Sequence, residues 1–191
     1  HQSEFIKGFI PRSIFIGVDG GFAPWVGALI KDIEQPILLI APEGREEEVI
    51  IRLSRVGFDN TLGYLKGSFN SWKDAGKEID TLRSVSAETL EEEINKNKVA
   101  VFDIRKPGEY DSEHIENVPS TPLDYINSHV DEFPSDKDFY VHCAGGYRSV
   151  IASSILKARG IHNVIDVAGG YAAIRNTGIS RTEKVCPSTL K

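Results

Sequence analysis

The chain has 191 residues, room for one large or two small domains, and 40% of them are hydrophobic, enough to build ordinary cores. Charged residues make up 26%, the formal net charge is -6 and there is no basic block, so nucleic acid and anionic membranes are not expected partners. No apolar run has transmembrane length and no signal-peptide pattern is present, which predicts a cytoplasmic location.

Cysteine and histidine usage argues against disulfides and metal sites. The two cysteines, Cys143 and Cys186, are too few for a disulfide framework and fit a reducing compartment. We interpret Cys186 as a tail cysteine, with a resolving thiol as the alternative. The five histidines lack the paired spacing of metal ligands, so we expect neither a metal nor another cofactor. The absence of methionine indicates a fragment of a longer polypeptide.

The N-terminal half alternates short apolar runs with helical patterns. Its expected elements are strand 13–16, helix 21–30, strand 36–40, helix 46–55, strand 61–64 and helix 68–75. This order of strands and helices is typical of an α/β fold.

The C-terminal half continues the alternation. Its expected elements are helix 87–95, strand 99–103, helices 107–111 and 125–131, strand 139–142, a helix from near 147 to 159, strand 164–167 and helix 170–175. The pattern predicts a mainly parallel sheet flanked by helices, with the functional site beyond the carboxyl ends of the strands. Cys143 lies at such an end.

The two halves also resemble each other in sequence. When 53–60 is placed over 156–163, a leucine, a glycine and an asparagine align, and in the same register Arg45 falls on Arg148. The repeated pattern indicates a tandem duplication.

The repeat predicts two units, at 1–80 and 81–191, joined by a short linker within 75–86. The first unit has no counterpart of 101–105, which has the composition of an interior strand. Because a missing interior strand leaves backbone groups unpaired, we expect this unit to be N-terminally truncated and completed by upstream residues or by a neighbour.

The segment 143–149 has the composition of a reactive cysteine loop. Gly145 and Gly146 can adopt positive φ and turn successive N–H groups inward as an anion-binding nest. The helix that follows adds unpaired N–H groups and the positive end of its dipole, and Arg148 adds a cation. We expect Cys143 to be a nucleophile that is ionised near neutral pH; the alternative is a small core residue at a strand end.

This loop resembles the active-site loop of rhodanese-type sulfurtransferases, in which a cysteine takes up a sulfane sulfur as a persulfide and passes it to a nucleophilic acceptor. The resemblance implies that Cys143 and Arg148 are catalytic. It also implies that substrate is bound by Ala144, Gly145, Gly146, Tyr147 and Ser149, although Ser149 could instead cap the helix. Phosphatases and arsenate reductases of related type have one residue more between cysteine and arginine, and the shorter ring suits a single sulfur atom.

Four residues around this loop allow either a structural or a chemical role. Asp103 and Arg105 end the strand 99–103 and resemble a rhodanese signature whose role is structural support, which we favour over substrate binding. His114 and His142 could be taken for general bases. We interpret both as packed side chains, since His142 and Cys143 alternate in a strand and face opposite ways.

The first unit lacks the features of a sulfur-transfer site. Ile40 takes the place of Cys143, and Pro42 removes an N–H from the ring. Glu43 and Glu46 put negative charge where an anion would bind. We expect this unit to be catalytically inactive and to serve packing or interaction.

The predicted function is transfer of a sulfane sulfur from thiosulfate or a low-molecular-weight persulfide to a thiol or sulfite, through a Cys143 persulfide. The alternatives are a non-catalytic rhodanese-like interaction module and a phosphatase-like or arsenate-reducing enzyme. An inactive unit before an active one resembles the C-terminal part of fusion proteins that begin with a metallo-β-lactamase-like persulfide dioxygenase. The expected partners are therefore small sulfur-containing anions or thiols and an upstream domain; homo-oligomerisation is left open.

Overall fold

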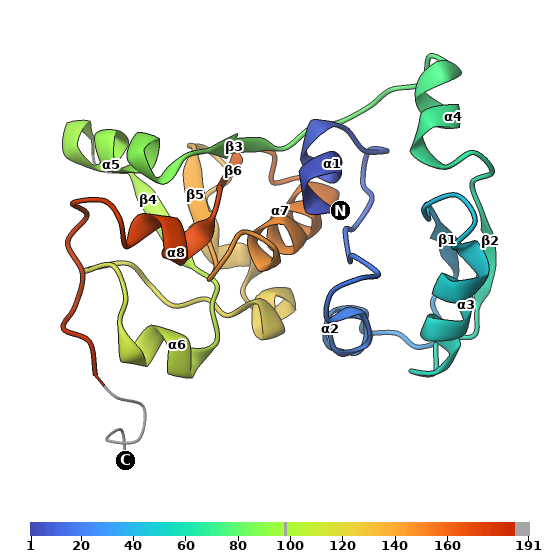
Figure 1. Cartoon of the computed structure of the whole chain (residues 1–191), viewed down its shortest axis with the longest axis horizontal. Coiled ribbons are helices and arrows are strands. Elements are labelled where there is room, and N and C mark those ends of the chain that lie inside the picture. Colours follow the sequence, from blue (N-terminus) through green and yellow to red (C-terminus); the bar gives the residue numbers. More distant parts are fainter. Residues whose placement is uncertain (98, 186–191) are drawn as a thin grey trace.

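The computed structural model describes residues 1–97 and 99–185, and Cys186 lies outside these ranges. Two separate parallel sheets form within them, one of four strands and one of two (Figure 1). None of the helices in these ranges has both the length and the apolarity that crossing a bilayer requires. The predicted α/β class, with a parallel sheet flanked by helices, is confirmed for the larger sheet.

The four-stranded sheet belongs to the C-terminal half. Its order is β3 (Arg83–Val85), β6 (Val164–Val167), β5 (Phe139–His142) and β4 (Ala100–Asp103), with every neighbouring pair parallel. Strands β4, β5 and β6 follow their apolar runs, as predicted. Strand β3 was not predicted, because it is short, polar in its first two residues and lies inside the expected linker 75–86.

Helices cover both faces of this sheet. On one face lie α5 (Ala87–Lys96) and α8 (Gly170–Ile174), which share a core cluster with Tyr140. On the other lies α7 (Arg148–Ala158), which packs with Phe139. Successive residues of a strand point to opposite faces, and this explains the division.

Three helical elements connect β4 to β5. The α-helix α6 (Pro107–Ser112) comes first and is followed by two short 3-10 helices, η1 (Leu123–Ser128) and η2 (Val130–Glu132). The predicted helix 125–131 is therefore wrong in type and extent. Its hydrogen bonds span three residues, as in Tyr125 N to Pro122 O at 3.0 Å, which is the 3-10 pattern.

The N-terminal half contains α1 (Gln2–Lys7), α2 (Phe22–Leu29), β1 (Ile37–Leu39), α3 (Glu46–Ser54), β2 (Thr61–Tyr64) and α4 (Ser68–Asp74). Strands β1 and β2 form the two-stranded sheet, which packs with α2 and α3 in a core of its own. The outer face of this sheet is apolar and open, since Leu38 is 76% and Leu62 64% exposed.

The predicted strand 13–16 is absent. The segment has no regular secondary structure, and the backbone N–H of Phe15 donates to the Ser154 hydroxyl of α7 at 2.9 Å. A side-chain hydroxyl thus satisfies a backbone N–H of this apolar run outside a sheet.

Corresponding glycines in the two halves share an unusual backbone conformation. Gly67 and Gly169 both have φ of 74° and directly precede helices, α4 and α8. Gly57 and Gly160 both follow a helix, with φ of 89° and 90°. These values lie in the left-handed region, where glycine is favoured. Both halves thus place a left-handed glycine at these helix ends.

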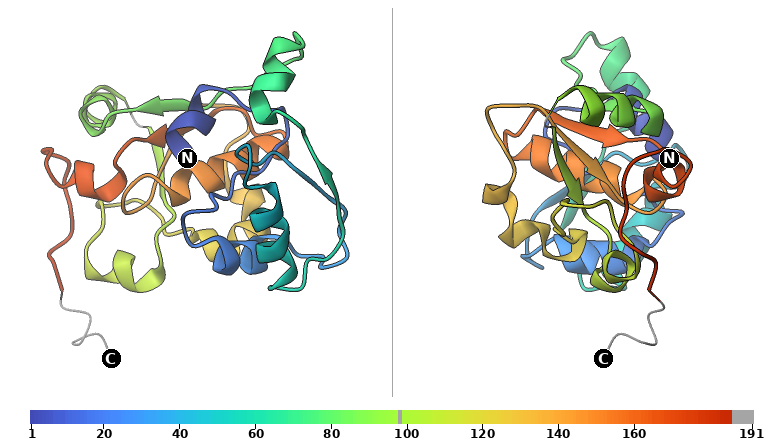
Figure 2. Two further views of the ribbon diagram at one scale, coloured as in Figure 1. Left: turned by 45° about the vertical axis from the view of Figure 1, so that its right-hand side comes forward. Right: turned by 90° about the vertical axis from the view of Figure 1, so that its left-hand side faces the viewer.

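The N-terminal segment packs directly on the C-terminal half. Phe9, Phe15 and Leu29 belong to the same core cluster as the buried residues of α7. Backbone bonds add to this contact, with Leu82 N donating to Ile6 O at 3.0 Å. Helix α7 consequently lies between the sheet and the N-terminal segment, as the views in Figures 1 and 2 agree, and eight consecutive residues of it are buried.

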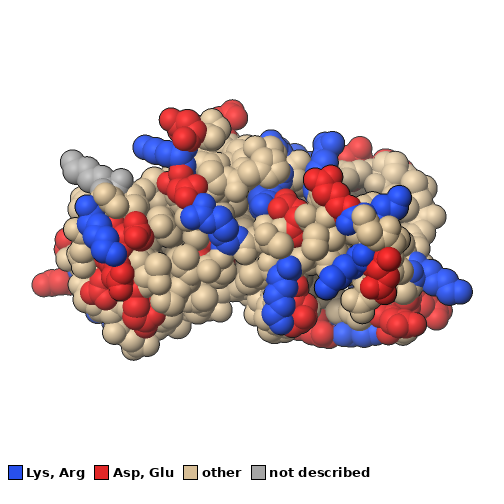
Figure 3. Space-filling view, turned by 90° about the horizontal axis from the view of Figure 1, so that it is seen from above, with Lys and Arg blue, Asp and Glu red and all other residues tan. Residues whose placement is uncertain are grey.

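Charges of both signs are mixed over the surface. In Figure 3, Lys and Arg side chains lie next to Asp and Glu on the face that is shown. Ion pairs form among the described surface residues, such as Arg83 with Asp138 at 2.6 Å. This face therefore carries no uniformly basic field that would attract a polyanion.

Candidate active site

The cysteine loop emerges from the middle of the four-stranded sheet. Strand β5 lies between β6 and β4 and ends at His142, and α7 begins at Arg148. Cys143 therefore stands at the carboxyl edge of the sheet, directly before the N-terminus of a helix. This is the position at which parallel α/β sheets hold their ligands.

Helix α8 holds the backbone of this loop. The N–H of Tyr171 donates to the carbonyl of Cys143 at 2.6 Å, and the N–H of Ala172 donates to that of Ala144 at 3.0 Å. Gly170 lies so close that a Cβ on it would sit 2.3 Å from the Cys143 carbonyl oxygen. Only glycine fits this position, and the loop carbonyls are thereby turned toward α8.

One of the two predicted loop glycines adopts the conformation expected for it. Gly146 has φ of 89°, in the left-handed region. Gly145 is not in that region, and a Cβ there would meet nothing within 4 Å. The expectation of positive φ at Gly145 is therefore wrong, since the turn is completed by Gly146 alone.

The sulfur of Cys143 has two polar neighbours. It accepts a hydrogen bond from the N–H of Gly146 at 3.1 Å, and its thiol lies 3.6 Å from the Ser149 hydroxyl. The predicted ring of several amides is thus represented, in the described residues, by one N–H on the sulfur. Cys143 is only 1% exposed. A donor molecule therefore reaches its sulfur only when the loop, or the residues packed over it, move.

Arg148 is held by a carboxylate that sequence reasoning did not place in the site. Its Nη1 and Nη2 donate to Glu109 Oε2 and Oε1 at 2.6 and 2.8 Å. This bond raises the pKa of Arg148 and lowers that of Glu109, and the charge of nearby Cys143 adds to the rise at Arg148. Glu109 could have been found from its place in the helix after β4, the strand beside β5.

Asp103 and Arg105 form a buried ion pair at the same edge. Arg105 Nη2 donates to Asp103 Oδ2 at 2.6 Å, and Nε donates to both carboxylate oxygens. The guanidinium also lies 3.8 Å from the centroid of the Tyr171 ring and donates to the Glu113 carbonyl. These contacts tie β4 to α8 and to the end of α6, which is a supporting arrangement.

Neither candidate histidine reaches the sulfur. His142 is fully buried on the opposite side of β5, and burial lowers its pKa despite Asp103, whose Oδ2 lies 3.8 Å from Nε2. His114 stacks on Tyr110, with ring centroids 3.8 Å apart. Both are therefore packed side chains.

Tyr147 turns away from the loop toward the N-terminal half. The Gly17 N–H donates to its hydroxyl at 3.0 Å, and the hydroxyl lies 3.2 Å from the Gly17 carbonyl. Its ring makes an edge contact with Phe15, and burial raises its pKa. This pairing spans 130 positions, so no local pattern could reveal it.

The segment of the N-terminal half that the predicted repeat aligns with this loop holds its arginine differently. Arg45 donates to Asp19 at 2.7 and 2.9 Å and to Glu48 at 2.8 and 3.1 Å. Ile40, at the place of the cysteine, offers no nucleophile.

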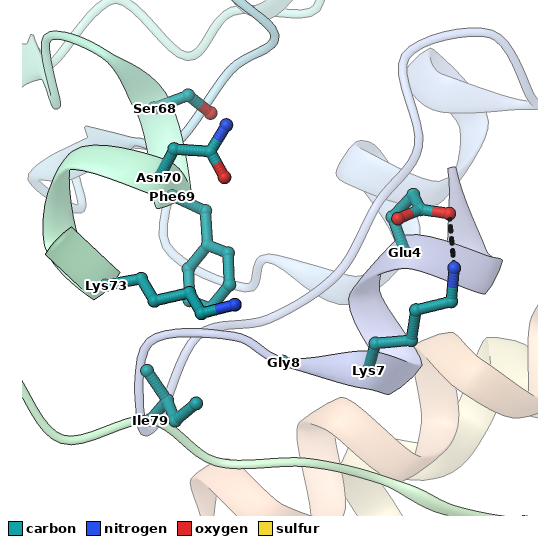
Figure 4. A pocket seen from close by; sticks show the side chains of 8 residues that line it. All are labelled: Glu4, Lys7, Gly8, Ser68, Phe69, Asn70, Lys73 and Ile79. Atoms are coloured by element: carbon teal, nitrogen blue, oxygen red, sulfur yellow. Dashed lines mark hydrogen bonds and ion pairs between the residues drawn. The ribbon is translucent and has the colours of Figure 1, made fainter.

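A hollow outside this region lies between α1 and α4 (Figure 4). It is lined by Glu4, Lys7, Gly8, Ser68, Phe69, Asn70, Lys73 and Ile79. In it Lys7 donates to Glu4 at 2.9 Å. None of these residues belongs to the cysteine loop.

Comparison with known proteins finds similarity in the C-terminal half. Residues 86–177 match the family described as Rhodanese-like domain. A sulfurtransferase of Allochromatium vinosum is 27% identical over 99 residues, 51% of this chain and 92% of that protein. A crystal structure of a rhodanese-like domain protein from Staphylococcus aureus is 28% identical, covering 55% of this chain and 100% of that one, with a TM-score of 0.49.

A further relative is longer than the matched region. YrkF of Bacillus subtilis is 26% identical over 106 residues, 55% of this chain and 55% of that protein. The chain therefore spans about half the length of this relative.

Proposed function

Residues 86–177 form a rhodanese-like domain, and from this premise we propose that the chain is a sulfurtransferase that carries a sulfane sulfur on Cys143. The observation that carries the proposal is the position of the Cys143 sulfur at the carboxyl edge of the sheet, 3.1 Å from the Gly146 N–H. The sulfurtransferase of Allochromatium vinosum, which matches over 92% of its own length, supports the same class of reaction.

The proposed reaction has two displacement steps. The Cys143 thiolate attacks the outer sulfur of thiosulfate; a new S–S bond forms, the old one breaks, and sulfite leaves with its electron pair. With a low-molecular-weight persulfide as donor, the leaving group is the corresponding thiolate. A thiol or sulfite then attacks the terminal sulfur of the Cys143 persulfide, which restores the thiolate.

The loop stabilises the sulfur anion in both steps. Gly146 supplies its N–H and Ser149 its hydroxyl, and Arg148, oriented by Glu109, supplies positive charge at the rim. We assign substrate contacts to the loop residues Ala144 and Gly145, and structural support to Asp103 and Arg105. The side chain of Tyr147, predicted to contact substrate, is bound to Gly17 instead. We assign no separate base, because neither His114 nor His142 reaches the sulfur.

We further propose that the chain arose by tandem duplication, with an inactive unit at 1–80 and an active one at 81–191. Matching element order and matching left-handed glycines support this reading. Ile40 leaves the first unit without a nucleophile. Because the chain resembles persulfide dioxygenase fusions, a low-molecular-weight persulfide is the donor to test beside thiosulfate. We propose that the transfer takes place in the cytoplasm.

Single-turnover transfer tests the proposal. The purified chain is mixed with thiosulfate or glutathione persulfide, and sulfur delivered to cyanide or a thiol is measured. We expect Cys143→Ser to abolish transfer and Cys186→Ser to retain it. Transfer that survives in Cys143→Ser contradicts the proposal.

A non-catalytic interaction module is the second candidate, and the burial of Cys143 at 1% exposure favours it. Such a module transfers no sulfur with either donor. Hydrolysis of a phosphate ester or reduction of arsenate by the wild-type chain would instead support the third class.

A further inference from the structure

Residues 15–20 of the N-terminal half contact the cysteine loop at Tyr147. This segment connects α1 to α2 and runs beside α7 (Figure 1). We propose that it is the positioning element of the Cys143 loop and acts by holding the hydroxyl of Tyr147; the inference rests on the proposed sulfur transfer.

The bond between Gly17 and Tyr147 fixes the hydroxyl in two directions. The Gly17 N–H donates to the oxygen at 3.0 Å, and the hydroxyl donates to the Gly17 carbonyl at 3.2 Å. A hydroxyl can donate one hydrogen bond and accept others. Gly17 alone therefore uses the hydroxyl of Tyr147 both as an acceptor and as a donor. The tyrosine is thereby tied to a backbone and not to a mobile side chain.

Two glycines give the tyrosine ring room against this backbone. A Cβ on Gly17 would lie 3.2 Å from Tyr147 Cε2, and a Cβ on Gly20 would lie 2.7 Å from the hydroxyl oxygen. Neither glycine has the left-handed φ that strains other residues, so alanine at either place acts on the ring and not on the backbone. These glycines therefore serve close approach.

The segment is anchored at both ends, which lets it act as a fixed support. At one end the Phe15 N–H donates to Ser154 of α7 at 2.9 Å. At the other, Asp19 receives two hydrogen bonds from Arg45, and the carbonyl of Val18 receives one from Arg52. Arg45 aligns with Arg148, so the inactive loop uses its arginine to hold the segment that supports the active loop.

Holding Tyr147 also holds its two neighbours in the chain. Gly146 provides the N–H on the sulfur, and Arg148 begins α7 and binds Glu109. If the hydroxyl is released, both can shift away from Cys143. Positioning by Tyr147 therefore affects the rate of the chemical step more than the binding of the donor.

Tyr147→Phe tests this directly, because it keeps the ring and removes both hydrogen bonds. We expect kcat for sulfur transfer to fall at least about fivefold with little change in KM, because about fivefold is the factor that one ordinary hydrogen bond supplies and two are lost. The alkylation rate of Cys143 by iodoacetamide, measured in the Cys186→Ser background, should rise because the loop opens. Alkylation does not depend on sulfur transfer, so it separates this inference from the proposed function.

Gly20→Ala is the second variant and leaves the tyrosine intact. Its new methyl group displaces the hydroxyl, and alkylation should rise as in Tyr147→Phe; combining the two changes should give less than the product of their effects. Gly27→Ala is the matched control, since a Cβ there meets nothing within 4 Å, and it should behave as the parent. Unchanged alkylation in both Tyr147→Phe and Gly20→Ala, with circular dichroism showing folded protein, overturns the inference.

Discussion

At the scale of single residues, the site depends on how charge is distributed around one sulfur atom. Arg148 does not offer an unpaired cation, because both of its terminal nitrogens donate to Glu109. The pair orients the guanidinium at the rim of the loop and lowers the net positive charge there. The sulfur relies on the Gly146 N–H and the Ser149 hydroxyl for direct contacts.

Replacing Glu109 by glutamine tests the importance of this pair. Arg148 lowers the pKa of Glu109 from its ordinary 4.5, so the unfolded chain takes up the proton first as pH falls. The contribution of the pair to stability is therefore complete above pH 4.5 and is lost as the pH drops through the folded-state pKa. Glu109→Gln should lower Tm at neutral pH, and its difference from wild type should shrink in acid.

Glu116→Gln is the control for this prediction, since Glu116 makes no ion pair among the described residues. Its Tm should follow that of wild type at each pH. An equal Tm for Glu109→Gln and wild type at pH 7 would show that the pair contributes nothing to the folded state.

His142 should make the fold sensitive to mild acid. Burial lowers its folded-state pKa below 6.5, so between pH 6.5 and that value the unfolded chain binds a proton that the folded chain does not. Stability should therefore decline as pH falls below 6.5. Denaturant melts from pH 7.5 to 5.5 should show a smaller decline in the free energy of unfolding for His142→Leu than for wild type. His162→Gln, a change at an exposed position, is the control and should follow wild type. Equal slopes in all three proteins contradict this prediction.

At the scale of elements, the close contact between α8 and the loop decides the loop's shape. Gly170 has φ of 55° and no room for a Cβ beside the Cys143 carbonyl. Gly170→Ala should lower the free energy of unfolding by at least about 2 kcal/mol, as backbone strain and overpacking combine. Gly145→Ala, where a Cβ meets nothing, should stay within about 0.5 kcal/mol of wild type. Urea melts measure both, and similar losses would contradict the contact.

Local pattern predicted the elements that position the site, but not their long-range partners. The apolar run at β5, the helical spacing of α7 and the glycines around them are local features, so the loop could be placed at the end of a strand. The prediction of a strand at 13–16 was wrong, because the propensity of a segment for extended structure does not show whether a neighbouring strand is there to pair with it. Gly17, Glu109 and Tyr171 escaped notice as neighbours of the loop, since contacts between distant segments leave no spacing in the sequence.

At the scale of the whole molecule, the N-terminal half supports the C-terminal one through a shared core. Phe15 is 8% exposed and packs on Phe5 and Tyr147, with ring centroids 5.0 and 5.8 Å apart. Phe15→Ala should cost about 3 kcal/mol of unfolding free energy and raise alkylation of Cys143, because it removes a buried ring beside the loop.

Ile14→Ala is the matched control for Phe15→Ala, since the neighbouring side chain is 47% exposed. It should change stability by less than about 1 kcal/mol and leave alkylation unchanged. Equal effects of the two substitutions would argue against a shared core between the halves.

The most direct test of the central claim is mass spectrometry of the peptide that contains Cys143, taken after the full chain has been treated with thiosulfate or glutathione persulfide. The account predicts a gain of one sulfur atom on Cys143, reversed by cyanide or a thiol and absent in Cys143→Ser. An unmodified Cys143 with both donors, in folded protein, would contradict it.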